Sequence, residues 1–71
     1  MSRDDALRAK WVGRFAALPA PARDALRGAL LDLRAEALDR AEYCWRKHKA
    51  PMAAYWKAVG VYAGHMARSL R

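Results

Sequence analysis

Apolar residues recur three or four positions apart in the last third of the chain, over residues 51–71. This spacing places large side chains on one face of a helix. The stripe consists of Met52, Tyr55, Trp56, Val59, Tyr62, Met66 and Leu70. Most of the remaining surface of this segment is Ala, Gly and Val. A helix that is apolar around so much of its circumference must be covered on more than one side, by the same chain or by a partner.

Two further helices are predicted before it, over about residues 3–18 and 21–49. The first carries large apolar side chains at helical spacing, namely Leu7, Trp11, Phe15 and Leu18. The second carries a broader apolar arc, formed by Leu26, Leu30, Leu33, Ala37, Ala41, Cys44 and His48, with Leu31, Leu38 and Trp45 beside them. Glu36 and Arg40, four residues apart, are expected to pair on its exposed face. Pro19, Pro21 and Pro51 separate the three helices.

These elements predict an all-α fold in a single domain, residues 1–71. Composition agrees, because Ala, Leu and Arg favour helices and the only β-branched residues are three valines. The helix lengths predict that the first helix covers one half of the long central helix and the last helix covers the other half. Apolar surface then remains at both ends, which favours a homodimer that completes the bundle. The alternative is a kink at Gly28 that lets a monomer close.

Positive charge is concentrated late in the chain. The formal net charge is +7 at pH 7. Residues 1–42 carry eight Lys/Arg against seven Asp/Glu, whereas residues 43–71 carry six Lys/Arg and no acidic residue. The excess therefore lies close to the apolar last helix. A concentrated positive field attracts phosphate, anionic lipid or an acidic protein surface.

The sequence contains no catalytic or cofactor-binding motif, so we expect no enzyme activity, no cofactor and no small-molecule substrate. Cys44 and His48 lie four apart in the predicted central helix, but a zinc site needs two more ligands and only His65 remains among Cys and His. One cysteine cannot form an intrachain disulfide, which fits a reducing cytoplasm. No export signal is visible, and Lys57 and His65 interrupt the apolar segment that approaches membrane-spanning length.

Cations and aromatic rings alternate where the central helix is predicted to end. Such side chains neutralise phosphate, and an exposed ring stacks on an unpaired base. The candidate anion-binding residues are Arg46, Lys47, Lys49, Lys57, Arg68 and Arg71, with Tyr43 and Trp45 as aromatic contacts. The alternative is an ordinary solvated helix end, where Lys and Arg stabilise the negative end of the helix dipole. Gly60, Gly64 and Leu70 match the spacing of a helix-turn-helix, but no recognition helix follows them.

A strip of small residues runs along the last helix, with Gly60 and Gly64 four apart. Small residues let another helix approach closely. Together with Trp56, they are expected to pack against another helix of this chain or against a second copy. Trp11 and Trp45, which lie in or beside apolar stripes, are also expected in the core.

These patterns favour a small, basic, cytoplasmic binding protein that is not an enzyme. The first interpretation is a nucleic-acid-associated regulator that contacts phosphates through its C-terminal half. The second is a protein–protein interaction module, an inhibitor or adaptor that binds an acidic partner surface. A short chain of this kind would suit a phage or plasmid gene. A cationic membrane-active helix is disfavoured, because the charge of the first 42 residues is balanced.

Overall fold

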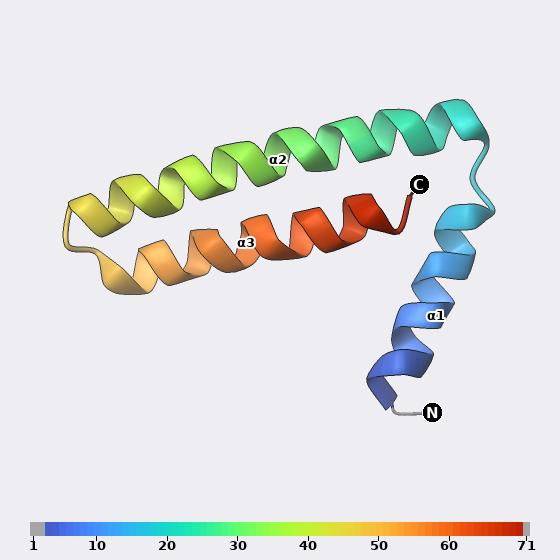
Figure 1. Cartoon of the computed structure of the whole chain (residues 1–71), viewed down its shortest axis with the longest axis horizontal. Helices are drawn as coiled ribbons and strands as arrows, with labels where there is room; N and C mark the ends of the chain where they lie inside the picture. The colour runs from blue at the N-terminus through green and yellow to red at the C-terminus, as the bar shows by residue number, and fades with distance from the viewer. Residues whose placement is uncertain (1–2, 71) are drawn as a thin grey trace.

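The computed structural model describes residues 3–70 and contains three helices in that range, with no strand (Figure 1). They are α1 (Arg3–Ala16), α2 (Ala20–Arg46) and α3 (Ala50–Arg68). Each matches a predicted helix, although α1, α2 and α3 end two to three residues before their predicted ends. α2 runs without a break through Gly28, so the kink that the sequence left open is not observed. The all-α prediction is confirmed.

α2 and α3 form an antiparallel hairpin and pack against each other along the length of α3 (Figure 1). Their contact is a seam of side chains spaced alternately by three and four residues, as in a coiled coil. On α3 the seam consists of Ala53, Trp56, Gly60, Ala63 and Ala67, with Leu70 just beyond the helix, and on α2 of Arg23, Arg27, Leu30, Arg34, Ala37, Ala41 and Cys44, with Leu38 beside them. Most of its α3 members are small, and therefore the two backbones approach closely.

The large residues of α3 were expected in the core, and for most of them that prediction is wrong. Met52, Tyr55, Tyr62 and Met66 are exposed, and Val59 is half-buried. Each precedes a seam residue by one position, which rotates it by about 100° from α2. We call these five residues, Met52, Tyr55, Val59, Tyr62 and Met66, the large-residue face.

Gly60 lies at the centre of the seam. A Cβ atom at this position would come within 2.9 Å of Leu38 Cδ2 and 3.1 Å of Leu38 Cγ. A Cβ at Gly64 would lie 3.1 Å from Cδ of Arg34, whose side chain crosses from α2. The two predicted packing glycines therefore both face α2 within the same chain. At Gly28 the space around a Cβ is open, with nothing within 4 Å.

α1 does not fold back onto α2, which corrects the predicted bundle. It leaves the start of α2 at an angle and projects away from the hairpin (Figure 1). Within residues 3–70, α2 and α3 are the pair of helices that pack extensively. Pro19 sits at the junction with φ −56° and ψ 148°, an extended conformation that turns the chain away from the helix axis. Leu7, Trp11 and Val12 of α1 consequently remain exposed.

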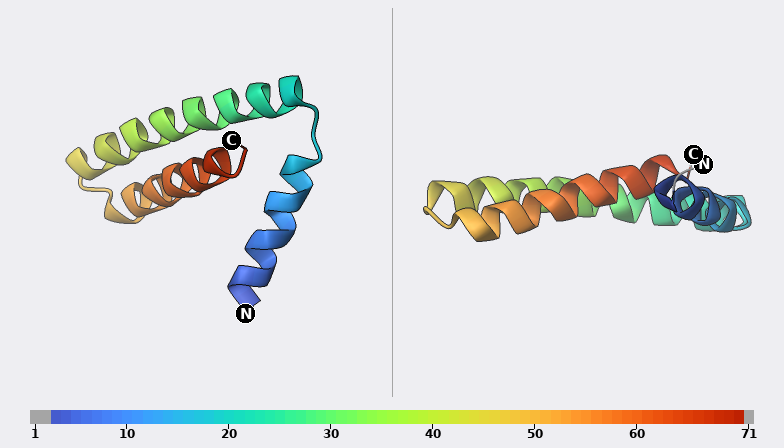
Figure 2. Two further views of the ribbon diagram at one scale, coloured as in Figure 1. Left: turned by 45° about the vertical axis from the view of Figure 1, so that its right-hand side comes forward. Right: turned by 90° about the horizontal axis from the view of Figure 1, so that it is seen from below.

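The three helices lie in one layer, as the edge-on view in Figure 2 shows. The Cα atoms span 42 × 31 × 11 Å. Two stacked helix layers would need about 13–15 Å in the shortest direction, because packed axes are 8–10 Å apart and each helix adds its own radius. The radius of gyration is 14.4 Å, compared with about 11 Å for a compact domain of 71 residues.

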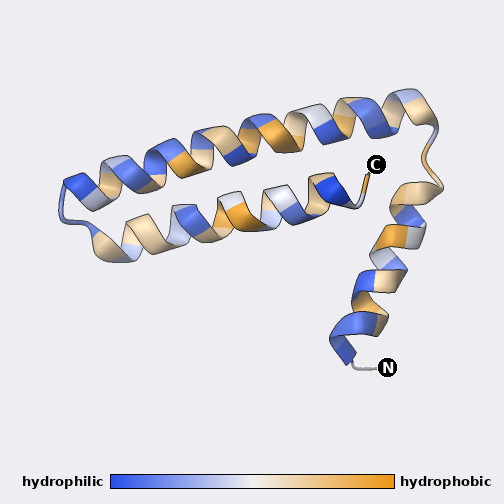
Figure 3. Cartoon of the chain, viewed as in Figure 1, coloured by the Kyte–Doolittle hydropathy of each residue, from blue (hydrophilic) through white to orange (hydrophobic). Residues whose placement is uncertain are grey.

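A single layer leaves little of the chain buried. The buried apolar residues among those described are Ala37, Ala53, Ala63, Ala67 and Leu70. No large side chain in residues 3–70 is fully enclosed. In Figure 3 the hydrophobic segments of α1 lie apart from those of the hairpin. Folded proteins normally bury their apolar surface between two packed layers of secondary structure. The helices of this chain form one layer, so much of their apolar surface stays exposed.

Some side-chain contacts follow the sequence closely. Arg40 donates to Glu36 through Nη2 at 2.9 Å, which confirms the predicted pair on α2. The guanidinium of Arg40 also lies 5.0 Å from the ring centroid of Trp56, so it connects α2 to α3. Trp56 is half-buried beneath it, and Tyr55 packs edge-on against its ring at 5.3 Å. Cation–π contacts of this kind contribute about 0.5–1 kcal/mol at exposed sites.

The turn between α2 and α3 ends α2 with a Schellman motif. The N–H of Lys49 donates to the Cys44 carbonyl at 2.8 Å, and the N–H of His48 donates to the Trp45 carbonyl at 3.1 Å. His48 has φ 62°, the left-handed conformation that glycine usually supplies at this position. His48 therefore lies in the turn and not four residues beyond Cys44 on one helical face. The predicted Cys44–His48 stripe is wrong at its last residue, because α2 ends at Arg46.

Replacing His48 with glycine should stabilise the protein by about 1 kcal/mol, because glycine avoids the steric cost of the left-handed conformation. Thermal and urea unfolding followed by circular dichroism measure this gain. Lys49→Gly is the matched control, since Lys49 has an ordinary φ of −106° and gains nothing from glycine. Equal or lower stability of His48→Gly relative to Lys49→Gly would contradict the expectation.

Candidate binding surfaces

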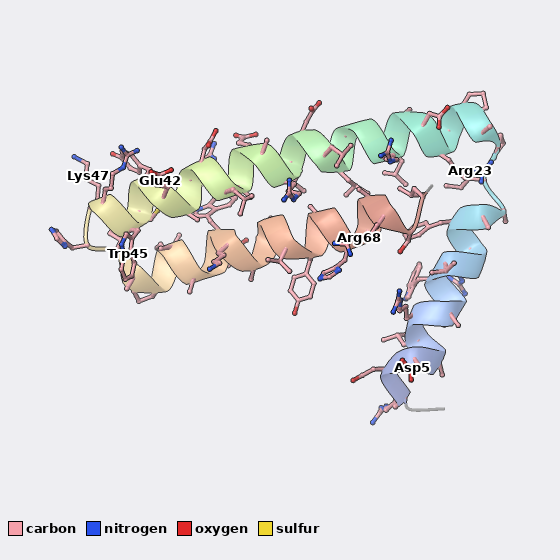
Figure 4. All side chains as sticks on the ribbon, viewed as in Figure 1. Asp5, Arg23, Glu42, Trp45, Lys47 and Arg68 are labelled. Carbon is pink, nitrogen blue, oxygen red and sulfur yellow. The ribbon has the colours of Figure 1, made fainter. Side chains whose placement is uncertain are left out.

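The predicted anion-binding residues fall into two groups at opposite ends of the hairpin. Arg46, Lys47, Lys49 and Lys57 lie at or near the α2–α3 turn, with Tyr43 and Trp45. We call these six residues the turn patch. Arg68 lies in the last turn of α3, about 28 Å away at 1.5 Å per helical residue. Figure 4 shows Trp45 and Lys47 at one end and Arg68 at the other. Arg71 lies outside the described residues.

The turn patch has exposed aromatic rings. Trp45 is 68% exposed, so its predicted place in the core is wrong. The reason is that Trp45 follows the seam residue Cys44 by one position and faces an open side of the hairpin, the side opposite the large-residue face. Tyr43 is 54% exposed, and Lys47 Nζ lies 5.8 Å from the centroid of its ring. Trp45 also borders a shallow groove of about 440 Å³ with Glu42 and Lys57.

A larger cleft of about 980 Å³ opens between α1 and the C-terminal end of α3. The described residues that line it are Arg8, Trp11, Val12, Phe15, His65, Met66, Arg68 and Ser69. We call this feature the α1–α3 cleft. The α1 residues recur at helical spacing, so the apolar face of α1 is the face that looks into the cleft. Two arginines and one histidine border it, and none of the described lining residues is acidic.

Trp11 and Phe15 form the aromatic part of the cleft lining and contact neighbouring side chains of α1. The rings of Trp11 and Phe15 lie 6.1 Å apart, and the guanidinium of Arg14 lies 5.1 Å from the Trp11 centroid. These contacts hold the Trp11 ring, although 45% of the residue remains exposed. Trp11 was expected in the core, and the structure instead places it on an open apolar wall. It stays open because α1 does not pack on the hairpin.

Further arginines lie in the seam at the same end of the molecule, where the sequence predicted leucines. Arg23 and Arg27 are half-buried, and the Nε atom of each is enclosed without a hydrogen-bond acceptor among the described residues. Figure 4 shows Arg23 at the start of α2, near the junction with α1. Leu26 and Leu33 were predicted in the buried stripe, and both are exposed. Ala37, Ala41 and Cys44 are spaced by four and three residues. If this spacing is continued toward the N-terminus, it predicts Arg23 and Arg27 in the seam.

The described residues contain neither a metal-binding group nor a membrane-spanning helix. Within residues 3–70, no three side chains of His, Cys, Asp and Glu come together in a group that could hold a metal ion. No helix in this range is both long enough and apolar enough to cross a membrane. Cys44 is a free, half-buried thiol in the seam.

No protein-family model matches this chain, and neither a curated protein sequence nor a solved structure matches it. Function must therefore be inferred from the geometry of the chain itself. Three surfaces stand out: the turn patch, the α1–α3 cleft and the large-residue face.

Proposed function

We propose that this chain is a homodimeric protein–protein interaction module, which binds an acidic amphipathic helix of a partner protein in the α1–α3 cleft. It acts by binding and not by catalysis. The observation that carries the proposal is the composition of the cleft, which combines apolar and cationic side chains without a carboxylate among the described lining residues. Amphipathic helices are commonly recognised by hydrophobic grooves of this kind.

The cleft supplies both halves of such recognition. Trp11, Phe15 and Met66 offer apolar contacts, and Arg8 and Arg68 offer positive charge. Trp and Arg are the residues that most often dominate binding energy in protein interfaces. An incoming row of Asp and Glu would pair with Arg8 and Arg68, whereas a basic helix would be repelled.

The openness of the cleft favours a helix over a small ligand. Sites for small molecules usually enclose 70–90% of the ligand surface. A molecule whose Cα atoms span only 11 Å in the shortest direction cannot surround a ligand in this way. A helix, in contrast, would contact α1 on one side and α3 on the other, and would complete the layer. The partner is therefore proposed to be a segment of protein.

The exposed area supports the proposed homodimer. The chain exposes 5665 Å² of surface. A compact monomer of 8.0 kDa exposes about 4,450 Å², so this chain has an excess of about 1,200 Å². Two copies that each cover this excess would bury about 2,400 Å² in total, which is in the range of obligate dimers. Pairing of two copies thus supplies the second layer that one copy lacks.

Nucleic-acid binding is the second candidate function, and the turn patch favours it. Trp45 and Tyr43 are exposed beside Arg46, Lys47 and Lys49, which is the combination of stacking rings and cations that single-stranded nucleic acid binds. Arg68 lies too far away to belong to the same site. A nucleic-acid site is therefore proposed at the turn alone, with contacts to phosphates and unpaired bases.

The cleft proposal is tested by selecting binders from a phage-displayed library of helical peptides. We expect the enriched peptides to be acidic, with apolar residues three and four positions apart. Their affinity, measured by fluorescence polarisation, should fall at least 10-fold for the double variant Arg8→Glu, Arg68→Glu, because the attraction becomes repulsion. Both arginines are exposed, so the variant should retain its fold.

Two variants serve as controls for this experiment. Arg8→Lys with Arg68→Lys keeps the charge and should retain most of the binding. Arg46→Glu with Lys47→Glu makes the same charge change at the opposite end of the hairpin and should leave peptide binding unchanged. Selection of neutral or basic peptides, or equal loss in the Arg46→Glu, Lys47→Glu variant, would overturn the proposed cleft.

A further inference from the structure

The large-residue face has an unusual internal symmetry. Its residues recur at steps of three, four, three and four, which is the spacing of a coiled-coil seam. Read in either direction from Val59, the order of side chains is the same: a tyrosine and then a methionine. The methionines lie seven residues before and after Val59, and the tyrosines lie four before and three after it. The face is therefore nearly self-complementary under reversal of the helix.

The large-residue face carries no charge, and the charged residues beside it on α2 form an ion pair. None of its five members is charged, and four of them are exposed, with Tyr62 68% exposed. In an antiparallel hairpin, the positions that precede the seam by one residue lie on the same side of both helices. On α2 these positions include the exposed residues Leu26 and Leu33, together with the Glu36–Arg40 ion pair. Two copies can therefore meet on this side without bringing like charges together.

The opposite side of the hairpin is different. The positions that follow the seam by one residue include the charged residues Glu42, Lys57 and Arg68, together with the exposed apolar residues Leu31, Trp45 and Val61. The shared groove of Glu42, Trp45 and Lys57 shows that these positions do lie on one side of the hairpin. On α3 this side carries Lys57 and Arg68, whereas the large-residue face carries no charge. The large-residue face is thus the better candidate for self-association.

We infer that two copies pair through their large-residue faces, with the two α3 helices antiparallel and a two-fold axis near Val59. A two-fold interface brings the same patch of both copies together, so the patch must complement itself. The reversed order of side chains meets this requirement: the rings of Tyr55 and Tyr62 lie near those of the other copy, and Met52 lies near the other Met66. The inference rests on the homodimer of the proposed function and specifies its interface.

The first test is the effect of a charge on the mass of the protein. Sedimentation equilibrium of the full chain at micromolar concentration should give about 16 kDa, twice the 8.0 kDa of one chain. Tyr62→Glu should weaken the dimer at least 100-fold and give a monomer, because an unpaired carboxylate would be buried at the interface. Val61→Glu is the matched control. Val61 is 45% exposed on the opposite side of the hairpin, and its variant should remain dimeric.

The second test addresses the orientation of the two copies. In a Cys44→Ser background, Val59→Cys should form an intermolecular disulfide under mild oxidation by oxidised glutathione, because a residue near the two-fold axis meets its own equivalent. Val61→Cys should not cross-link at the same rate. Disulfide formation requires Cα atoms about 4.4–6.8 Å apart. Only a residue close to the two-fold axis lies this near to its equivalent in the other copy.

The outcomes distinguish the existence of a homodimer from the position of its interface. A wild-type mass of 8.0 kDa at tens of micromolar would overturn the homodimer itself. A wild-type dimer that Val61→Glu dissociates and Tyr62→Glu does not would overturn the interface and leave the homodimer standing. Failure of Val59→Cys to cross-link in a confirmed dimer would overturn the position of the two-fold axis.

Discussion

Gly60→Leu should destabilise the protein by about 3 kcal/mol and separate α2 from α3. A Cβ atom alone would already lie 2.9 Å from Leu38 Cδ2, and leucine adds three further carbon atoms to this contact. Overpacking of a close contact costs about 1–3 kcal/mol, and the small residues along the seam leave little room to adjust. A chain of 71 residues has a total stability of roughly 4–11 kcal/mol, so the loss is a large fraction of it.

Gly28→Leu is the matched control for this experiment. Gly28 is also a glycine within a helix, but nothing lies within 4 Å of a Cβ placed there. Because leucine is a better helix former than glycine, this variant should gain about 0.7 kcal/mol. Urea unfolding at equal protein concentration, followed by circular dichroism, compares the two variants. Similar stability of both would show that the seam does not depend on close approach at Gly60.

Binding of a single-stranded oligonucleotide should weaken about 50-fold between 50 and 200 mM salt if the turn patch binds nucleic acid. The estimate assumes four phosphate contacts, from Arg46, Lys47, Lys49 and Lys57, and a slope of about −0.7 per contact. Fluorescence anisotropy of a labelled oligonucleotide measures it. Arg46→Gln with Lys47→Gln removes two contacts and should reduce the salt effect to about 7-fold.

Arg68→Gln is the control for the turn patch, because it removes a cation at the far end of α3. This variant should bind the oligonucleotide as the wild type does. Absence of binding at 50 mM salt would eliminate nucleic acid as a ligand. Equal losses in the Arg68→Gln variant and the turn variants would mean that binding follows net charge and not the turn.

The seam, the large-residue face and the α1–α3 cleft have different roles in the proposed assembly. The small-residue seam holds the hairpin together, the large-residue face is proposed to pair two copies, and the α1–α3 cleft is proposed to take a partner. Met66 belongs to both the face and the cleft. Dimerisation and partner binding would therefore share one side chain, and the Tyr62→Glu variant should be examined for peptide affinity as well as for mass.

The sequence was sufficient to predict the helices and their order. Apolar periodicity and the three prolines are local properties, and a helix forms when its own residues favour it. The pairing of Glu36 with Arg40 is equally local, because residues four apart are neighbours on a helix. The exposure of Trp45 beside the cations of the turn could not be predicted in the same way, because exposure depends on which other helix lies nearby.

Only the tertiary structure decided which side of α3 is buried. Its small residues and its large residues form two stripes about 100° apart, and both are apolar enough to pack. The small stripe contacts α2 because Gly60, Ala63 and Ala67 allow a close approach of the two backbones, which leaves the large stripe open. The direction of α1 was likewise not predictable, because it is set by the backbone at Pro19 and by the absence of packing against the hairpin. The sequence alone determined which segments are helical, since that is decided within each segment; the tertiary structure decided which faces remain free to bind, since that is decided between segments.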